Sequence, residues 1–97
     1  MSLQPIREEI DRIDQELVTL FKKRMDCAKQ VGEYKKTNGL SVLNEAREKE
    51  ILDSAETAGG EYGHAARLLF SSIMVLSRAL QHDITGSGKA LRTLLES

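Results

Sequence analysis

Apolar residues recur at helical spacing along the first third of the chain. At about 100° per residue they fall within one arc, as expected for one face of an α-helix. The members of this stripe are Ile6, Ile10, Ile13, Leu17, Leu20, Phe21, Ala28 and Val31. Pro5 suits the first turn of a helix, and Asn38 followed by Gly39 suits its end. The pattern therefore predicts one long helix over about 6–36.

Two shorter helices are predicted from the rest of the pattern. Apolar positions keep helical spacing over about 43–57 and again over about 63–83. Gly59 and Gly60 separate these segments, and a glycine-rich stretch at 86–88 follows the second. The chain has a single proline and is rich in good helix formers such as leucine, alanine, glutamate and lysine. The predicted fold is all-α, a three-helix protomer with one long N-terminal helix.

Two cations interrupt the apolar stripe of the long helix. Arg24 and Lys35 lie near the centre of the arc that holds the stripe. Transfer of an unpaired charge out of water costs many kcal/mol, so each cation needs a counter-ion. A bound anion would serve as well as a carboxylate of the protein. The two cations therefore predict an anionic ligand held between helices.

The long helix is too long for a compact domain of this size. About 31 residues at 1.5 Å each span ~46 Å, whereas such a domain has a radius of gyration near 13 Å. The stripe therefore needs a second chain to cover it. In an antiparallel pair, Arg7 of one chain would reach the Arg24 region of the other, ~25 Å along the helix. A solvated position for Arg7 fits the spacing equally well. The expected assembly is an intertwined helical homodimer.

The second predicted helix carries a carboxylate on its apolar side. Glu48 falls in the same arc as Ile51, and Asn44 and Arg47 flank that arc. Acidic side chains are also common near helix N-termini, where the helix dipole favours them. The position of Glu48 within the arc favours a role in a site over this simpler explanation.

The third predicted helix places two polar residues on a largely apolar surface. Ser77 and Gln81 lie one turn apart, on the same line as Met74. Alone, they would be interpreted as hydrogen-bonded polar groups of the core. Beside the charges of the first two helices, a shared polar pocket is the better interpretation. The exposed strip of this helix is expected to include Arg67 and Arg78.

Composition limits the remaining functions. Lys and Arg total 14 against 15 Asp and Glu, so no bulk charge would attract nucleic acid or an acidic membrane. The single cysteine, Cys27, excludes an intramolecular disulfide and is expected to be a small core residue. No apolar run reaches membrane-spanning length or resembles a signal peptide, so the cytoplasm is the expected location. His64 and His82 lack a third ligand at metal spacing, and no metal site is expected.

These charged and polar positions also carry a family resemblance. From about Leu3 to Asp83 the chain resembles the all-helical class of chorismate mutases. The segments that carry the resemblance are Ile6–Asp14, Arg24, Val31–Lys35, Arg47–Leu52, and the pair Ser77 and Gln81. Single helix motifs of charged residues are weak signals, but five in register rarely arise by chance.

The resemblance implies a fold and an activity. The fold is a three-helix protomer in an intertwined dimer with two active sites. The activity is the Claisen rearrangement of chorismate to prephenate in phenylalanine and tyrosine biosynthesis. Because the rearrangement is intramolecular, the resemblance implies no acid, base, nucleophile, metal or cofactor. The protein would hold the folded substrate and stabilise charge on its ether oxygen.

The resemblance also implies a role for each site residue. Arg24 and Arg7 of the partner subunit would hold the two substrate carboxylates, with support from Ser77 and Arg47. Lys35 and Gln81 would face the ether oxygen whose bond breaks. Glu48 would accept a hydrogen bond from the substrate hydroxyl. Asn44 stands beside that hydroxyl, where the family often has an aspartate, and its amide keeps hydrogen-bonding capacity.

The sequence leaves the tail and the exact chemistry open. Residues 1–84 are expected to form the chorismate mutase domain. The tail 85–97 is either a capping helix, given the spacing of Leu91, Leu94 and Leu95, or a linker to a fused domain such as prephenate dehydratase. An isochorismate-pyruvate lyase of the same fold is an alternative function. A non-catalytic metabolite-sensing domain and a purely structural helical dimer are two others.

Overall fold

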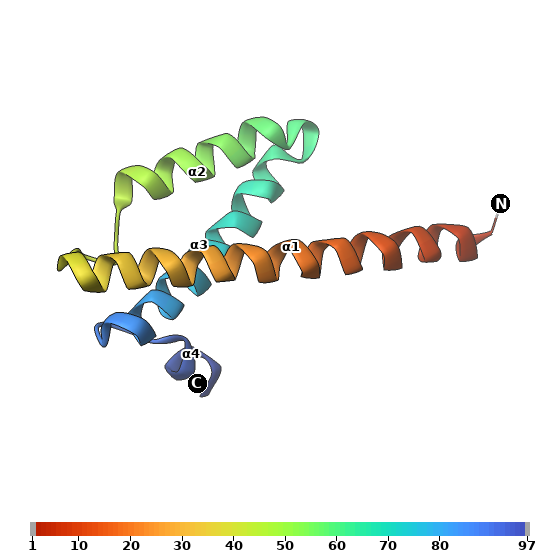
Figure 1. Cartoon of the computed structure of the whole chain (residues 1–97). Coiled ribbons are helices and arrows are strands. Elements are labelled where there is room, and N and C mark those ends of the chain that lie inside the picture. Colours follow the sequence, from red (N-terminus) through yellow and green to blue (C-terminus); the bar gives the residue numbers. More distant parts are fainter. Residues whose placement is uncertain (1, 97) are drawn as a thin grey trace.

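The computed structural model describes residues 2–96, and that range is all-α, with no strand. Figure 1 shows the arrangement of the elements. They are α1 (Leu3–Asn38), α2 (Glu45–Ala58), a 3-10 turn η1 (Gly60–Tyr62), α3 (Gly63–Thr85) and α4 (Leu91–Glu96). The all-α prediction is confirmed. The three predicted helices lie within a few residues of their expected bounds, and the tail adds the short helix α4.

Side-chain and glycine caps explain where the first two helices begin and end. Ser2 accepts a hydrogen bond from the Gln4 amide, so α1 begins three residues before the predicted start at Ile6. Gly39 ends α1 in the left-handed region, at φ 64°. Asn44 then caps α2 by accepting from the Arg47 amide at 3.0 Å. The six residues between the helices, 39–44, are therefore a defined turn that leads α2 back toward α1.

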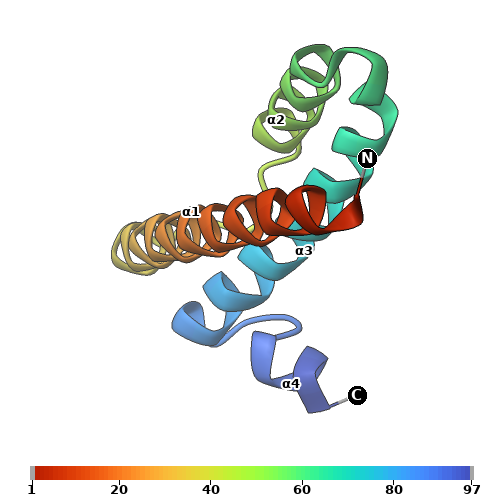
Figure 2. The ribbon, with the colours of Figure 1, turned by 90° about the vertical axis from the view of Figure 1, so that its right-hand side faces the viewer.

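Helix α3 is the centre of the protomer. It contacts α1, α2 and α4, and it crosses α1 steeply in both ribbon views (Figures 1 and 2). The Gly59–Gly63 turn permits a tight junction with α2, because a Cβ on Gly63 would lie 2.3 Å from the Glu56 carbonyl oxygen. At the other end, Gly32 of α1 lies close to Gln81 and Ile84 of α3. These close approaches fix α3 between the other two long helices.

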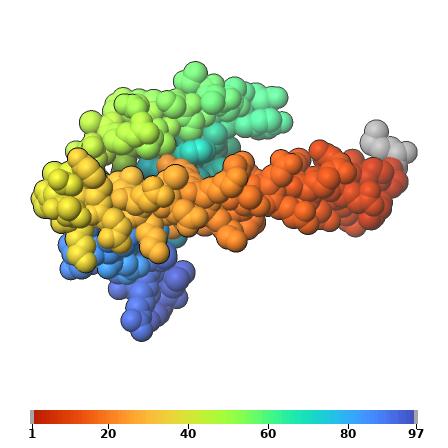
Figure 3. Space-filling model, in the orientation of Figure 1, coloured from red at the N-terminus to blue at the C-terminus, as the bar shows by residue number. Residues whose placement is uncertain are grey.

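The N-terminal half of α1 projects away from the rest of the chain. It stands clear of the other helices in the space-filling view (Figure 3). The protomer measures 57 × 28 × 24 Å, and its radius of gyration is 16.1 Å, against about 13 Å for a compact chain of this length. One copy of the chain is therefore an elongated body.

The core of a single copy is small. Its buried apolar side chains are Ala28, Val42, Ala55, Met74 and Ala79. By contrast, the stripe on the projecting half of α1 stays in solvent. Ile6, Ile10, Ile13, Leu17 and Leu20 are each 46–60% exposed. A contiguous apolar face of this kind marks an interaction surface. Within residues 2–96, no helix is long and apolar enough to cross a membrane.

Candidate active site

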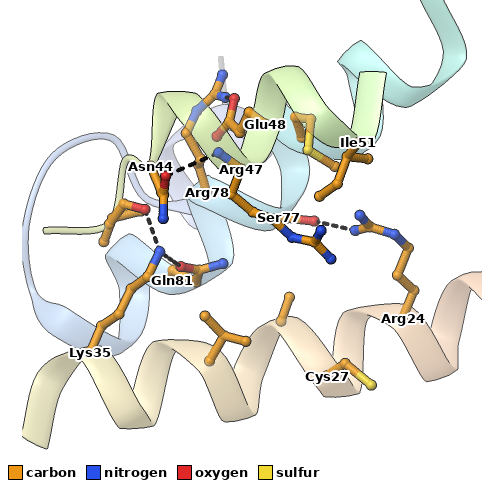
Figure 4. Close-up of a pocket in the computed structure, with 14 residues that line it drawn as sticks. Arg24, Cys27, Lys35, Asn44, Arg47, Glu48, Ile51, Ser77, Arg78 and Gln81 are labelled. Atoms are coloured by element: carbon orange, nitrogen blue, oxygen red, sulfur yellow. Dashed lines mark hydrogen bonds and ion pairs between the residues drawn. The ribbon is translucent and has the colours of Figure 1, made fainter. Parts of the chain in front are cut away.

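A cavity of about 290 Å³ lies between the C-terminal half of α1, the first turns of α2 and the second half of α3. Figure 4 shows side chains from all three helices pointing into it. Seven of the eight residues that the sequence predicts for the site line this cavity. They are Arg24, Lys35, Asn44, Arg47, Glu48, Ser77 and Gln81. The structure thus brings together residues up to 57 positions apart in the chain.

Arg24 and Ser77 occupy one end of the cavity. The Arg24 guanidinium reaches across from α1 and donates to Ser77 Oγ on α3 at 3.0 Å. Its carbon lies 6.0 Å from the centre of the Phe70 ring, within the range of a cation–π contact. Ser77 is buried, and Arg24 is half-buried. This end therefore presents a fixed guanidinium with donors left over for an anion.

Lys35 and Gln81 occupy the other end. The Lys35 ammonium donates to Gln81 Oε1 at 3.0 Å and to the Val42 carbonyl oxygen at 2.5 Å. Figure 4 shows Lys35 rising from α1 toward Gln81. Burial lowers the pKa of Lys35 by disfavouring its charged form, and the Glu48 carboxylate opposes that shift. The result is a partly desolvated cation beside a buried amide.

Glu48 finds its counter-ion on α3. Its carboxylate pairs with the guanidinium of Arg78, and both side chains are at most 30% exposed. The prediction that Arg78 lies on an exposed strip of the third helix is wrong, because Arg78 lines the cavity. The spacing of residues along the third helix could have predicted that Arg78 faces the cavity. Arg78 comes one turn after Met74 and directly after Ser77, both of which face the cavity.

Asn44 and Arg47 border the cavity at the start of α2. The side-chain oxygen of Asn44 accepts from the Arg47 backbone amide, and its NH₂ group can donate to a ligand. The Arg47 guanidinium pairs with Glu50 on the exposed side of the helix. Such an exposed pair is weak, so Arg47 is free to exchange this partner for a bound anion.

Two predicted positions differ from the rest. Arg7 is exposed on the projecting half of α1 and does not line the cavity of its own chain. It lies 17 residues, or ~25 Å, along the helix from Arg24. Cys27 was expected in the core, but the structure shows it exposed at the edge of the cavity. That expectation is wrong because the neighbouring Ala28, and not Cys27, is the buried residue at this point of α1.

The charge of the cavity is strongly positive. Its lining residues include the cations Arg24, Lys35, Arg47 and Arg78, and Glu48 is the one carboxylate among those in the described part of the chain. A cavity with excess cations favours the binding of small polyanions and stabilises negative charge that develops in them. Fold and site together define an all-helical protein with a cavity for a small organic anion.

Comparison with known families identifies the class. Residues 6–82 match the family described as chorismate mutase type II. The match covers most of the chain and includes every residue of the cavity described above. The chain therefore belongs to the chorismate mutase type II family, and the resemblance noted in its motifs is confirmed.

Curated relatives are similar over the same region. The chain is 35% identical over 68 residues to a T-protein of Haemophilus influenzae, covering 70% of this chain and 18% of that protein. It is 32% identical to a bifunctional chorismate mutase/prephenate dehydratase of Aquifex aeolicus, covering 81% and 25%. It is 31% identical to an intracellular chorismate mutase of Mycobacterium bovis, covering 69% and 64%. The chain thus spans less than two thirds of each relative. No solved structure matches it.

Proposed function

We propose that the protein is a chorismate mutase that converts chorismate to prephenate in phenylalanine and tyrosine biosynthesis. The observation that carries this proposal is the placement of Lys35 and Gln81 at one end of the cavity and Arg24 with Ser77 at the other. In the rearrangement, the ether C–O bond breaks while a C–C bond forms within the same molecule. No group leaves and no proton is transferred, so the protein needs only to hold and polarise the substrate.

Arg24 and Arg47 suit the carboxylates of the substrate. Arg24 is fixed by its hydrogen bond to Ser77, so little side-chain entropy remains to be lost on binding. A guanidinium binds a carboxylate through two parallel hydrogen bonds. Holding both ends of the substrate favours the folded conformer in which the two reacting carbons approach each other. This positioning supplies part of the rate enhancement.

Lys35 and Gln81 suit the ether oxygen. Negative charge grows on this oxygen as its bond to carbon breaks. The Lys35 ammonium keeps a third donor beyond those used by Val42 and Gln81, and the Gln81 NH₂ group keeps its donors. Two donors aimed at charge that grows in the transition state lower the barrier more than they strengthen ground-state binding.

Glu48 and Asn44 suit the hydroxyl of the substrate. The Glu48 carboxylate accepts from the hydroxyl proton, and the NH₂ group of Asn44 donates to the hydroxyl oxygen. This pair orients the ring without taking part in bond breaking. The aspartate common in the family is replaced here by a group whose oxygen already caps α2.

The active assembly is proposed to be an intertwined homodimer. The apolar stripe on the projecting half of α1 is half exposed in one copy, and a second α1 would cover it. In an antiparallel arrangement, Arg7 of the partner subunit would reach the Arg24 end of the cavity and bind a substrate carboxylate. Residues 1–84 would form this catalytic unit in the cytoplasm. The tail 85–97 would add α4, which packs on α3.

Loss of chorismate absorbance, with prephenate identified as the product, tests the proposal. Wild-type protein should turn over chorismate, and Arg24→Ala and Lys35→Ala should each lose at least about 100-fold in kcat/KM. Lys23→Ala and Lys36→Ala are matched controls, because they remove an exposed neighbouring cation from the same helix. Turnover of isochorismate instead would identify the lyase. Tight binding of chorismate without turnover would identify a sensing domain.

A further inference from the structure

The Glu48–Arg78 pair joins α2 to α3 at the wall of the cavity. The role proposed for Glu48 as acceptor of the substrate hydroxyl assigns nothing to Arg78. Yet Arg78 faces the cavity, and its guanidinium is engaged by the same carboxylate that the substrate needs. The inference drawn from this pair rests on the proposed function.

Glu48 has competing partners within the cavity. The Lys35 ammonium is close enough for the Glu48 carboxylate to influence its pKa. A direct ion pair between Glu48 and Lys35 would offset the positive charge of the ammonium and draw its Nζ away from Gln81. A carboxylate side chain has three rotatable bonds, so without a fixed partner it would sample that pairing. Arg78 pairs with the Glu48 carboxylate and supplies such a partner from helix α3.

Glu48 is the strongest hydrogen-bond acceptor among the described residues of the cavity, because an ionised acceptor forms stronger hydrogen bonds than a neutral one. Glu48 is the only carboxylate among the described lining residues. The Asn44 oxygen is neutral and already accepts the capping bond of α2, so it is a weaker acceptor than the carboxylate. The strength of the contact to the substrate hydroxyl therefore depends on where the Glu48 carboxylate is held.

We propose that Arg78 is a positioning residue that holds the Glu48 carboxylate toward the substrate hydroxyl and away from Lys35. Arg78 uses one side of the carboxylate, and the remaining lone pairs of Glu48 stay free for the hydroxyl. The proposal separates Arg78 from the residues that bind substrate directly.

A merely structural tie between helices is the competing explanation, and the chain offers a matched control for it. Arg67 also lies on α3 and donates to Asp53 of α2 at 2.8 Å. The Arg67 side chain is 32% exposed, close to the 30% of Arg78, but it does not line the cavity. Removal of either arginine breaks ion pairing between the same two helices, since Arg67 pairs with Asp53 and, at 3.8 Å, with Glu56. Only removal of Arg78 should affect the site.

A double-mutant cycle tests the proposal. The variants are Glu48→Gln, Arg78→Gln and their combination, assayed for kcat/KM with chorismate beside wild type and Arg67→Gln. Each single substitution at the cavity should lower kcat/KM by about 10- to 100-fold, the effect of one charge-assisted hydrogen bond. In the Glu48→Gln background, Arg78→Gln should lower it by less than about threefold further, because the two residues act as one unit. Arg78→Lys should recover most of the activity, and Arg67→Gln should retain it.

The outcomes separate the two proposals. Additive losses from Glu48→Gln and Arg78→Gln would show that Arg78 acts independently of Glu48 and would overturn this role. Equal losses of activity in Arg78→Gln and Arg67→Gln, in step with their denaturation midpoints, would overturn it in favour of a structural tie. Absence of chorismate turnover by the wild-type protein would instead refute the proposed function, and with it the role of the pair.

Discussion

The Lys35 ammonium donates a 3.0 Å hydrogen bond to Gln81 Oε1. This contact fixes which end of the Gln81 amide faces which neighbour, because an ammonium has no acceptor and can only meet the oxygen. The NH₂ group of Gln81 must then point elsewhere, and Gln81 is 8% exposed beside the cavity. Lys35 thus orients the NH₂ group of Gln81, and its own ammonium is the other donor at this end of the cavity.

The substitution Gln81→Glu should give an enzyme whose activity rises as the pH falls. Gln81→Glu replaces the NH₂ donor by a carboxylate oxygen, which donates only when it is protonated. At neutral pH the variant should lose at least about 100-fold in kcat/KM, because a negative oxygen would face the developing charge. Activity should return as the pH falls through the pKa of the new carboxyl. The pH profile of kcat/KM measures this, with Gln81→Leu as the control that cannot recover at any pH.

The pKa of Lys35 should set the alkaline limit of wild-type activity. Burial lowers this pKa below its ordinary value of 10.5, so the ammonium loses its proton earlier than an exposed lysine as the pH rises. Because the proposed function requires the Lys35 cation, kcat/KM should fall on the alkaline side below pH 10.5. The alkaline fall of kcat should lie at higher pH than that of kcat/KM, because a bound anionic substrate favours the charged form of Lys35.

Glu48→Gln should move this alkaline limit. The Glu48 carboxylate raises the pKa of Lys35, so Glu48→Gln should shift the alkaline fall of kcat/KM to lower pH. Lys36→Ala, at an exposed position on the same helix, should leave the fall where it is. A fall that keeps the same position in Glu48→Gln would mean that another group controls it.

Gly32 sets how closely α3 approaches α1 at the site. A Cβ at this position would lie 2.9 Å from Ile84 Cδ1 and 3.3 Å from Gln81 Cγ. Gly32→Ala should push the end of α3 outward and lower kcat/KM by about tenfold. Overpacking costs about 1–3 kcal/mol, and the better helix propensity of alanine offsets about 1 kcal/mol of that. Activity and denaturation midpoints measure both effects.

A second substitution makes the Gly32 prediction specific. Ile84→Val removes Cδ1, the atom nearest to the added Cβ. The double variant Gly32→Ala/Ile84→Val should therefore regain activity relative to Gly32→Ala alone. If Ile84→Val lowers activity equally in both backgrounds, the close contact is not the cause of the defect.

The sequence predicted most of the cavity because helical periodicity is a local property. A charge within an apolar stripe, as at Arg24, Lys35 and Glu48, is visible from spacing alone, and packing of the helices brings such charges together. Ser77 and Gln81 followed from the same reasoning. The roles of these residues in catalysis stay predictions until activity is measured.

The predictions for Arg78 and Cys27 were wrong, because the position of a side chain around its helix axis decides whether it faces the cavity, the core or solvent. Arg78 is one residue beyond Ser77, about 100° around α3, and sequence alone did not show that the cavity wraps far enough to include it. Cys27 lies beside the buried Ala28 on α1, yet it faces solvent. The angular width of the contact between two helices depends on their crossing, which is a tertiary property.

The apolar stripe of α1 can be tested as a dimer interface. Ile13→Glu would bury a carboxylate in an apolar contact between subunits, which is strongly unfavourable, so the variant should be monomeric and inactive. In an isolated protomer Ile13 is 46% exposed, and the same change would alter stability by less than about 0.5 kcal/mol. Gln15→Glu, about 160° away around the helix, is the control. Sedimentation velocity and the denaturation midpoint distinguish the two cases.

The placement of Arg7 can be tested by mixing two inactive variants. In the proposed dimer each site combines Lys35 of one chain with Arg7 of the partner subunit. Arg7→Ala and Lys35→Ala homodimers should both be inactive, because each has a defect in both sites. A mixed dimer has one site with both defects and one intact site. Random pairing makes half of the dimers mixed, so a 1:1 mixture refolded together should recover about a quarter of the wild-type activity.

The comparison needs a control for subunit exchange. Arg7→Ala mixed with Arg24→Ala should also recover about a quarter of the activity, because these defects too would fall in one site of the mixed dimer. Lys35→Ala mixed with Arg24→Ala should recover none, since each chain then carries a defect in its own site. If Arg7 acted within its own chain, every mixture would stay inactive, even though the mixed dimers form. Native mass spectrometry of the mixtures shows whether they have formed.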